Sequence, residues 1–386
     1  MKILIVKLSS LGDVVHTLPV LQDIHAALPG AQIDWAVEKS FAPLLSPLLS
    51  PLLSPLIPPL ASGRLHRIIP CEIRRWRQSP VAAATRREWR AFRAALQREA
   101  YDAVIDLQGL TKSALVARLA RLAPGGKRYA LANQTDGSGY EAPTRWVADV
   151  AIHIAPHTAA VARSRLLVAQ ALGYTPQATP DFGLKVAFVQ QSRAQAAPEN
   201  IAPADRLADK AAKNPDPGVV AFVHGTSRAD KEWPLAHWVV LGQRLNAAGY
   251  RIALPHGSAS ELRTSQAIAA ALNGGAAPAD GDAVVPPVAV VWPLLPLDAL
   301  TQALAPCAGV IGVDSGVSHI AVALDLPHVQ IYNVDTAWRT GPAPATPAAA
   351  CRQVSVFAQP TPSVDAVWQA WLACLAAGDA GGASAP

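Results

Sequence analysis

The chain has 386 residues, of which 51% are hydrophobic and 16% are charged, and its formal net charge is +5. This length favours two domains over a single compact core, and this composition excludes a globally disordered chain. The short apolar start is followed by Asp13 and His16, which excludes a secretory signal peptide, and no apolar run reaches the about 18 residues of a membrane-spanning helix. We therefore expect a cytoplasmic protein.

The first residues follow the pattern of a β-loop-α-β unit. Residues 2–6 predict a strand, residues 9–13 a turn, residues 14–28 a helix, and residues 33–37 the next strand. Such a unit begins a parallel sheet that helices cover. In the rest of the first half, the same patterns predict strands at 64–70 and 101–106 and helices at 89–100, 112–122 and 158–172.

Residues 44–55 repeat the sequence Leu-Leu-Ser-Pro three times. A proline at every fourth position removes backbone donors that a helix or a central strand needs. We interpret the repeat as a low-complexity insert in a surface loop. A loop that touches a membrane is the alternative, because eight leucines between Leu44 and Leu60 would otherwise be exposed.

Positive charge is concentrated in residues 64–128, which contain 15 Lys or Arg against 5 Asp or Glu. The stretch is either a solvated helix face or a surface for an anionic partner, such as a phosphorylated lipid, a membrane or a nucleic acid. We expect no nucleic-acid binding, because few aromatic residues are interleaved with the arginines.

Residues 186–217 are rich in Ala, Pro, Gln and Asp without a sustained period, which predicts a linker. We expect an N-terminal domain at 1–185, a C-terminal domain at 218–360, and a helix with a disordered tail at 361–386. Both domains should be Rossmann-like, doubly wound α/β domains that face each other across a ligand-binding cleft. The second should contain strands at 219–224, 251–255, 288–292, 310–313 and 328–332 and helices at 235–248, 262–272 and 315–324.

Three loops of the second half follow a strand, contain small residues and precede a helix, at 224–227, 256–258 and 314–316. Backbone amides at such a helix start favour a phosphate group. Lys231 lies downstream of the first loop and could contact a diphosphate, and Glu261 could accept hydrogen bonds from ribose hydroxyls. No standard dinucleotide or P-loop motif occurs, so the loops predict a nucleotide site of another type.

Asp13 directly follows Gly12 after the first strand. It is either the N-cap of the next helix or a general base. His16 lies one turn further along that helix, where it is either a packed residue or a ligand contact.

The four cysteines show neither a CxxC spacing nor a cysteine–histidine cluster, and no carboxylate cluster suits a divalent cation. We expect reduced core thiols, no metal and no cofactor. The cysteines are Cys71, Cys307, Cys351 and Cys374.

Several segments combine into one specific pattern. They are KLSSLGDVVHTLP at 7–19, DLQGLTKS at 106–113, HGTSRADKEWP at 224–234, LPHG at 254–257 and GVDSGVSH at 312–319. With this pattern, the chain resembles the lipopolysaccharide heptosyltransferases of glycosyltransferase family 9 over nearly its whole length. His16 in the first segment favours the type I branch of that family.

The resemblance implies a GT-B fold and transfer of L-glycero-D-manno-heptose from ADP-heptose to Kdo of Kdo2-lipid A, with inversion and without a metal. Asp13 would be the base that deprotonates the acceptor hydroxyl. The implied donor contacts are Thr226, Ser227, Lys231, Glu261, Asp314, Ser315, Gly316 and His319. The implied acceptor contacts are Ser10, Gly12, His16, Arg74, Arg75, Gln108, Lys112 and Arg163.

The acceptor is an anionic lipid, so the basic stretch at 64–128 would contact the cytoplasmic face of the inner membrane. A type II or III heptosyltransferase with another acceptor or sugar remains an alternative. From other classes, a nucleotide-sugar epimerase or a non-catalytic nucleotide-sugar-binding protein also fits the loops. Asp13 argues against the last two, since neither needs a base in that loop.

Overall fold

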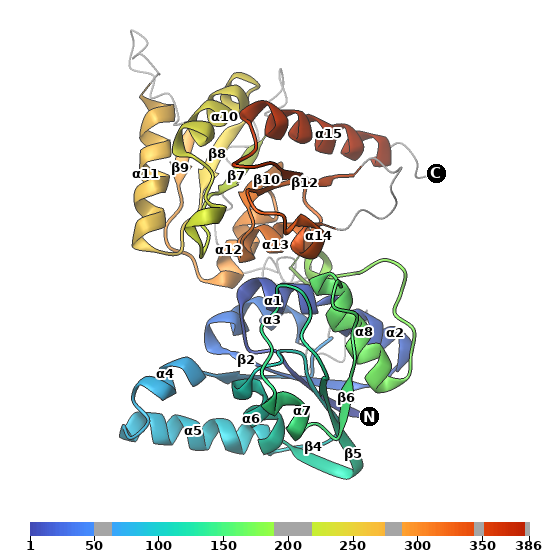
Figure 1. Cartoon of the computed structure of the whole chain (residues 1–386). Coiled ribbons are helices and arrows are strands. Elements are labelled where there is room, and N and C mark those ends of the chain that lie inside the picture. Colours follow the sequence, from blue (N-terminus) through green and yellow to red (C-terminus); the bar gives the residue numbers. More distant parts are fainter. Residues whose placement is uncertain (50–63, 189–217, 275–287, 343–350, 383–386) are drawn as a thin grey trace, which may run out of the picture. The chain divides into compact units, whose positions relative to one another are not determined.

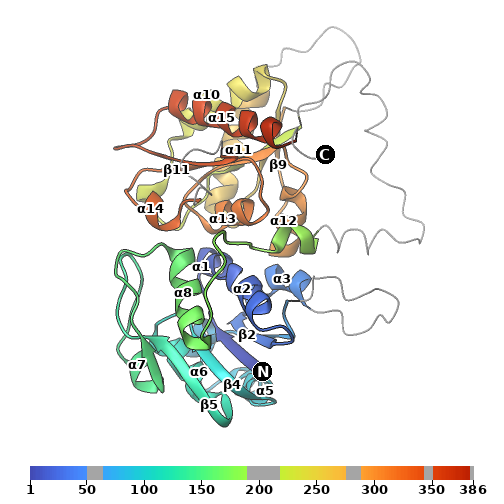
Figure 2. The same ribbon diagram turned by 90° about the vertical axis from the view of Figure 1, so that its right-hand side faces the viewer.

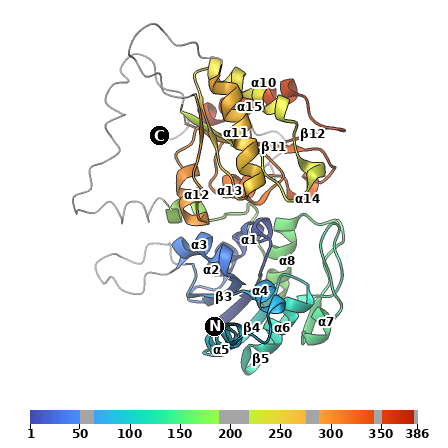
Figure 3. The same cartoon turned by 90° about the vertical axis from the view of Figure 1, so that its left-hand side faces the viewer.

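The computed structural model describes residues 1–49, 64–188, 218–274, 288–342 and 351–382. The chain divides into two compact units, Met1–Phe188 and Val189–Pro386. Each unit contains a six-stranded sheet whose strands pair in parallel, with helices on both faces (Figures 1, 2 and 3). The prediction of a doubly wound α/β fold is therefore confirmed.

Unit 1 has the strand order β3-β2-β1-β4-β5-β6. Its strands are β1 (Lys2–Val6), β2 (Gln32–Glu38), β3 (Arg67–Cys71), β4 (Ala100–Asp106), β5 (Arg121–Leu131) and β6 (Val150–Ile152). Its helices are α1 (Leu11–Thr17), α2 (Pro19–Ala27), α3 (Ala42–Leu45), α4 (Ile73–Gln78), α5 (Ala83–Leu96), α6 (Thr111–Leu119), α7 (Pro143–Val147) and α8 (Ala160–Leu172), with 3-10 turns η1 (Lys39–Phe41) and η2 (Ser46–Leu48).

Unit 2 repeats the same topology, with the order β12-β11-β10-β7-β8-β9. Its strands are β7 (Val219–Val223), β8 (Arg251–Leu254), β9 (Ala289–Val291), β10 (Gly309–Val313), β11 (His328–Tyr332) and β12 (Gln353–Phe357). Its helices are α10 (Leu235–Ala247), α11 (Ala259–Asn273), α12 (Leu297–Leu304), α13 (Gly316–Ala323), α14 (Ala337–Thr340) and α15 (Val364–Gly382), with the 3-10 turn η4 (Ala229–Lys231).

Several predicted boundaries in unit 1 were wrong. The helix predicted at 14–28 is two helices, because Pro19 starts α2 at a position where its missing amide is not needed. The helices predicted at 89–100 and 112–122 end at Leu96 and Leu119. Their last predicted residues belong to β4 and β5, where Ala100 pairs with Arg121.

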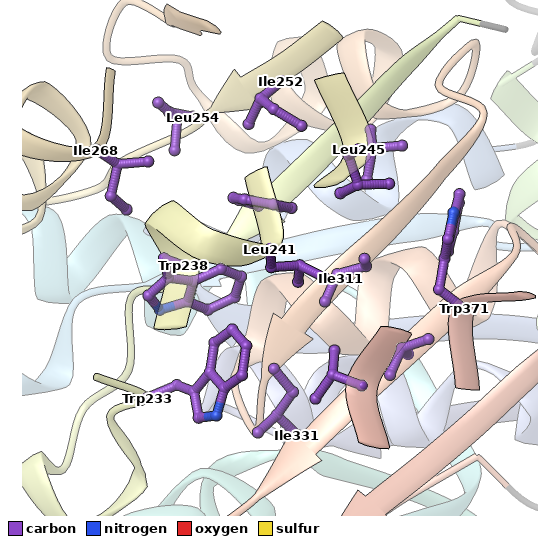
Figure 4. Packing of buried hydrophobic residues seen from close by; sticks show 14 of the residues in the cluster. Trp233, Trp238, Leu241, Leu245, Ile252, Leu254, Ile268, Ile311, Ile331 and Trp371 are labelled. Atoms are coloured by element: carbon purple, nitrogen blue, oxygen red, sulfur yellow. The ribbon is translucent and has the colours of Figure 1, made fainter. Parts of the chain in front are cut away.

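The core of unit 2 is built around tryptophans from three different segments (Figure 4). The rings of Trp233 and Trp238 meet edge to face, with centroids 4.9 Å apart. Trp371 of α15 is completely buried, so this C-terminal helix belongs to the core of unit 2. No helix within the described ranges is long and apolar enough to cross a membrane.

Most of the predicted linker at 186–217 lies outside the described residues, and residues 184–188 at its start are helical. The four cysteines are free thiols. Three of them are buried, and Cys351 is half-buried.

The first Leu-Leu-Ser-Pro repeat is packed, which corrects the prediction of a surface loop for this part. Leu44, Leu45 and Leu48 are at most 1% exposed. Pro43 and Pro47 lie in the first turns of α3 and η2, where a helix tolerates proline. The repeat therefore starts two short helical turns, and its remainder from residue 50 lies outside the described residues.

We predict that Leu45→Ala lowers the free energy of unfolding of unit 1 by about 2–5 kcal/mol, because it leaves a cavity in a packed region. Denaturant unfolding of the full chain measures the change. The matched control is the exposed neighbour Ser46, where Ser46→Ala should change stability by about 0.5 kcal/mol or less. Equal stability of the two variants would contradict the packing of this repeat.

Candidate functional site

In unit 1 the strand order reverses between β1 and β4, and ligands of doubly wound sheets bind at this reversal. Val6 and Asp106, the last residues of these strands, are partners in the ladder. The loops that follow the two strands therefore leave the sheet side by side. These loops carry Ser10 and Gln108, and Asp13 lies in the first turn of α1, directly after the first loop.

The carboxylate of Asp13 is held from two sides. Its Oδ2 atom accepts hydrogen bonds from the backbone amide of Ser10 at 3.1 Å and from the hydroxyl of Ser10 at 3.0 Å. Its Oδ1 atom lies 3.3 Å from Nζ of Lys7 and 3.8 Å from the guanidinium of Arg163. Burial raises the pKa of Asp13, but Lys7, the Ser10 amide, His16 and Arg163 outweigh burial, so its pKa lies well below the ordinary value.

The interpretation of Asp13 as the N-cap of α1 was wrong, although its carboxylate does take part in capping this helix. Ser10 is the N-cap of α1 and Asp13 is the third helical residue, whose carboxylate accepts the N-cap amide. The side chain nevertheless remains 33% exposed. An ionised carboxylate with an exposed face can still accept a proton from a ligand.

The other predicted acceptor residues near Asp13 differ in exposure. Gly12 is half-buried in the first turn of α1. His16 is buried and its charge acts on Asp13. Arg163 of α8 is also buried, and it donates a hydrogen bond to the hydroxyl of Thr135 at 3.0 Å.

Gln108 and Lys112 brace the loop that follows β1. The side-chain oxygen of Gln108 accepts hydrogen bonds from the backbone amides of Leu8 at 3.1 Å and Ser9 at 3.0 Å. The ammonium group of Lys112 donates to the hydroxyl of Ser9 at 2.8 Å. Both side chains therefore support the loop that carries Asp13.

Arg74 and Arg75 are exposed on α4. The charges of Lys112 and Arg74 both act on Glu38, so Arg74 lies near the braced loop. Arg75 pairs instead with Glu72, at 2.6 Å, and with Glu88 of α5. The structure brings Arg74 towards this loop and engages Arg75 in ion pairs with these two glutamates.

Sequence reasoning missed two buried charged residues in this region. Lys7 is 2% exposed, and its ammonium group donates to the backbone oxygen of Leu107 at 3.0 Å. Asp106 is 1% exposed, and burial raises its pKa to about 6. The available signal was a charged residue at the end of each apolar strand, where a core residue is otherwise expected.

In unit 2 the strand order reverses between β7 and β10, and Asp314 lies in the loop after β10. Its side chain is 5% exposed and forms an ion pair with Lys231. His319 lies 3.4 Å from the same carboxylate, and Thr226 donates to the backbone oxygen of Asp314 at 3.2 Å. Burial raises the pKa of Asp314, but His319 and Lys231 outweigh burial and hold it well below its usual range.

The sequence analysis missed two further side chains that contact Asp314. Thr340 and Gln330 donate to Oδ1 of Asp314 at 3.3 Å and 3.5 Å. They belong to α14 and β11, which are distant from Asp314 in the sequence. No sequence signal links such residues before the sheet order is known.

The loops at 224–227 and 256–258 converge on Glu261. The backbone amide of Gly257 donates to the carboxylate of Glu261 at 2.7 Å, and Ser258 caps α11 by accepting from the amide of Glu261 at 3.2 Å. A Cβ atom on Gly225 would lie 2.5 Å from the carboxyl carbon of Glu261. Position 225 therefore has no room for a side chain, because its loop passes directly against this carboxylate. Ser227, the last residue of the first loop, is exposed.

Ser315 and Gly316 form the start of α13, as predicted. Ser315 is the N-cap and accepts a weak hydrogen bond from the amide of Ser318 at 3.4 Å. Both residues are half-buried.

The side chain of His224 is buried and hydrogen-bonded to Ser265 at 2.7 Å, and burial lowers its pKa to about 4. His224 is thus a neutral part of the core beside this site.

Within the described ranges, no three His, Cys, Asp or Glu side chains are grouped in a way that could hold a metal ion. Two Rossmann-like units, one with a braced carboxylate and the other with small-residue loops at the starts of α11 and α13, have the architecture of a GT-B protein.

Comparisons with known proteins identify the family. Residues 89–365 match the model of glycosyltransferase family 9 (heptosyltransferase), and the chain belongs to this family. It is 36% identical to lipopolysaccharide heptosyltransferase 1 of Escherichia coli K12 over 86% of this chain and 88% of that protein. It is 34% identical to lipopolysaccharide heptosyltransferase 1 of Pseudomonas aeruginosa, over 88% and 81%.

The fold agrees with these relatives. The structure of the E. coli heptosyltransferase WaaC with ADP matches with a TM-score of 0.73 and 32% identity, over 96% of this chain and 98% of that one. The predicted resemblance to the type I branch is therefore confirmed, because these curated relatives are heptosyltransferases 1.

Proposed function

We propose that this chain transfers L-glycero-D-manno-heptose from ADP-heptose to Kdo of Kdo2-lipid A, in the biosynthesis of the lipopolysaccharide inner core. The observation that carries the proposal is the ionised, one-third exposed carboxylate of Asp13, which lies where the strand order of unit 1 reverses. Membership of the heptosyltransferase family and the likeness to heptosyltransferases 1 support the choice of sugar and acceptor.

In the proposed reaction, Asp13 accepts the proton of an acceptor hydroxyl while the oxygen of that hydroxyl attacks the anomeric carbon of heptose. The bond from this carbon to the diphosphate oxygen breaks, its electron pair stays on that oxygen, and ADP leaves. One base and one displacement invert the anomeric centre. The low pKa of Asp13 keeps the base ionised before the acceptor arrives.

Unit 2 supplies the donor contacts in this proposal. The leaving diphosphate carries developing negative charge, which preorganised cations and amide dipoles stabilise. Lys231 and the start of α13 at Ser315 and Gly316 are suited to this role, and we propose that they act in place of a divalent ion. The diphosphate would compete with Asp314 for Lys231. Glu261 would accept hydrogen bonds from the ribose.

The basic surface of α4 and α5 is proposed to contact anionic lipid on the cytoplasmic face of the inner membrane. Each basic residue near such a surface contributes about 1 kcal/mol of attraction. The exposed arginines in and beside these two helices are Arg74, Arg75, Arg77, Arg86, Arg87, Arg90, Arg93 and Arg98.

The test of the function is incubation of the purified protein with ADP-heptose and Kdo2-lipid A, followed by mass spectrometry of the lipid. We expect a product heavier by one heptose unit, together with free ADP. A chemically altered ADP-heptose in the absence of lipid would support an epimerase instead. Unchanged lipid and donor would reject the transferase.

We predict that Asp13→Asn keeps the affinity for ADP but lowers kcat by about 100-fold or more, because the amide cannot accept the proton. The rate of ADP release with both substrates measures kcat. The matched control is Asp365→Asn, which neutralises a carboxylate that is 79% exposed and should keep kcat within about 2-fold. Near-normal turnover by Asp13→Asn would exclude Asp13 as the base.

We also predict that Gly225→Ala weakens ADP binding by about 10-fold, or about 1.4 kcal/mol, because the new Cβ displaces Glu261. Titration calorimetry with ADP measures the dissociation constant. Gly257→Ala is the matched control: its Cβ would lie 3.5 Å from the Glu261 carboxylate, an ordinary contact, and it should weaken binding far less. Equal affinities of the two variants would argue against Glu261 as a ribose contact.

A further inference from the structure

Lys7 is a charged residue at a buried position where this fold is expected to have an apolar side chain. It follows β1, whose residues from Ile3 to Val6 are completely buried aliphatic residues. Its backbone is fixed by hydrogen bonds to Ala36 and from the indole of Trp35, at 3.3 Å and 3.1 Å. A buried ammonium group is costly unless partners compensate for its lost hydration. The sheet does not require this charge, so the role of Lys7 depends on its partners.

The partners of Lys7 connect it to Asp13. Its Nζ atom donates to the oxygen of Leu107 and lies 3.3 Å from Oδ1 of Asp13. Asp106 also attracts it, but the two oxygens of that carboxylate already accept from the amides of residues 108 and 109 and from the hydroxyl of Ser113. Asp13 is therefore the carboxylate that Lys7 contacts directly.

Other charged groups around Asp13 play smaller parts. Arg163 of α8 approaches the same Oδ1 atom but stays 3.8 Å away, and it also bonds to Thr135. His16, on α1 itself, acts on Asp13 through its charge. Lys7 lies nearer to Asp13 than Arg163 does, and the charge of Lys7 makes the largest contribution that lowers the pKa of Asp13.

We propose that Lys7 is a positioning residue, which holds the Asp13 carboxylate ionised and fixes Oδ1 while Ser10 fixes Oδ2. This inference rests on the proposed role of Asp13 as the base. Burial lowers the pKa of Lys7, and the negative charge of Asp13 opposes this effect. In the proposed reaction Lys7 keeps its proton, and the proton of the acceptor hydroxyl moves to Asp13 and then leaves through its solvent-exposed face. The arrangement weakens Asp13 as a base, but it orients the carboxylate and restores its ionised form rapidly after each transfer.

The test is the pH dependence of kcat/KM for Lys7→Met, which keeps the long apolar stem and removes the charge. Loss of the cation raises the pKa of Asp13, so the acidic limb of the profile should move upward by at least about one pH unit. Below its raised pKa the variant should therefore lose activity that the unsubstituted protein keeps, and the two proteins should differ less at neutral pH and above. Lys7→Arg, which keeps the charge, should leave the limb in place.

Lys2→Met is the matched control, because Lys2 begins the strand that Lys7 follows and pairs with Glu99 at the surface. Its profile should equal that of the unsubstituted protein. If Lys7→Met does not fold, Lys7→Gln replaces it, since the neutral amide can still donate to Leu107. A uniform loss of activity at every pH, with the limb unmoved, would reduce Lys7 to a structural residue and overturn the proposal.

A second measurement separates this inference from the proposed function. Titration of carbon-13-labelled aspartate carboxylates by NMR, with Asp13→Asn used for assignment, follows Asp13 without any turnover. A raised pKa of Asp13 in Lys7→Met would support the positioning role even if no heptose were transferred. An unchanged pKa would reject it even if the transfer were confirmed.

Discussion

The register between two central parallel strands decides where each polar cluster forms. Val6 lies opposite Asp106 in unit 1, and Val223 lies opposite Gly312 in unit 2. The loops after each pair must then emerge together at the point where the strand order reverses. Gly312 is part of this constraint, because a Cβ there would lie 2.8 Å from Cβ of Val223 and 2.4 Å from the hydroxyl of Ser318.

Each unit contains an ion pair between an aspartate and a lysine, but the more exposed member of the pair differs between the units. In unit 1 the carboxylate of Asp13 is 33% exposed and its lysine partner is 2% exposed. In unit 2 the carboxylate of Asp314 is 5% exposed and Lys231 is 14% exposed. An outward carboxylate can accept a proton, whereas an outward ammonium can bind an anion. Which member of the ion pair is buried therefore separates the proposed base from the proposed diphosphate site.

The sequence was most informative about the strands and loops that line these clusters. Apolar runs located β1, β7, β10 and β11 almost to the residue, because each is buried on both faces. The sequence was less informative about β5, where a proline, two glycines and three charged residues interrupt any apolar run and most residues are not buried. The first Leu-Leu-Ser-Pro repeat was misassigned because burial of Leu44 and Leu45 depends on contacts that spacing does not reveal.

By itself, the sequence determined the α/β class, the two-part organisation of the strand pattern, and the motifs that carry Asp13, Lys231 and Glu261. These follow from local patterns, since hydrophobic period and turn residues act within about a dozen positions. Only the tertiary structure decided which charges are neighbours. Lys7 meets Leu107, 100 positions away, because parallel pairing joins β1 to β4, and it meets Asp13 because α1 folds back over the end of β1. Burial then decides which of those charges faces the solvent and which supports it from the core.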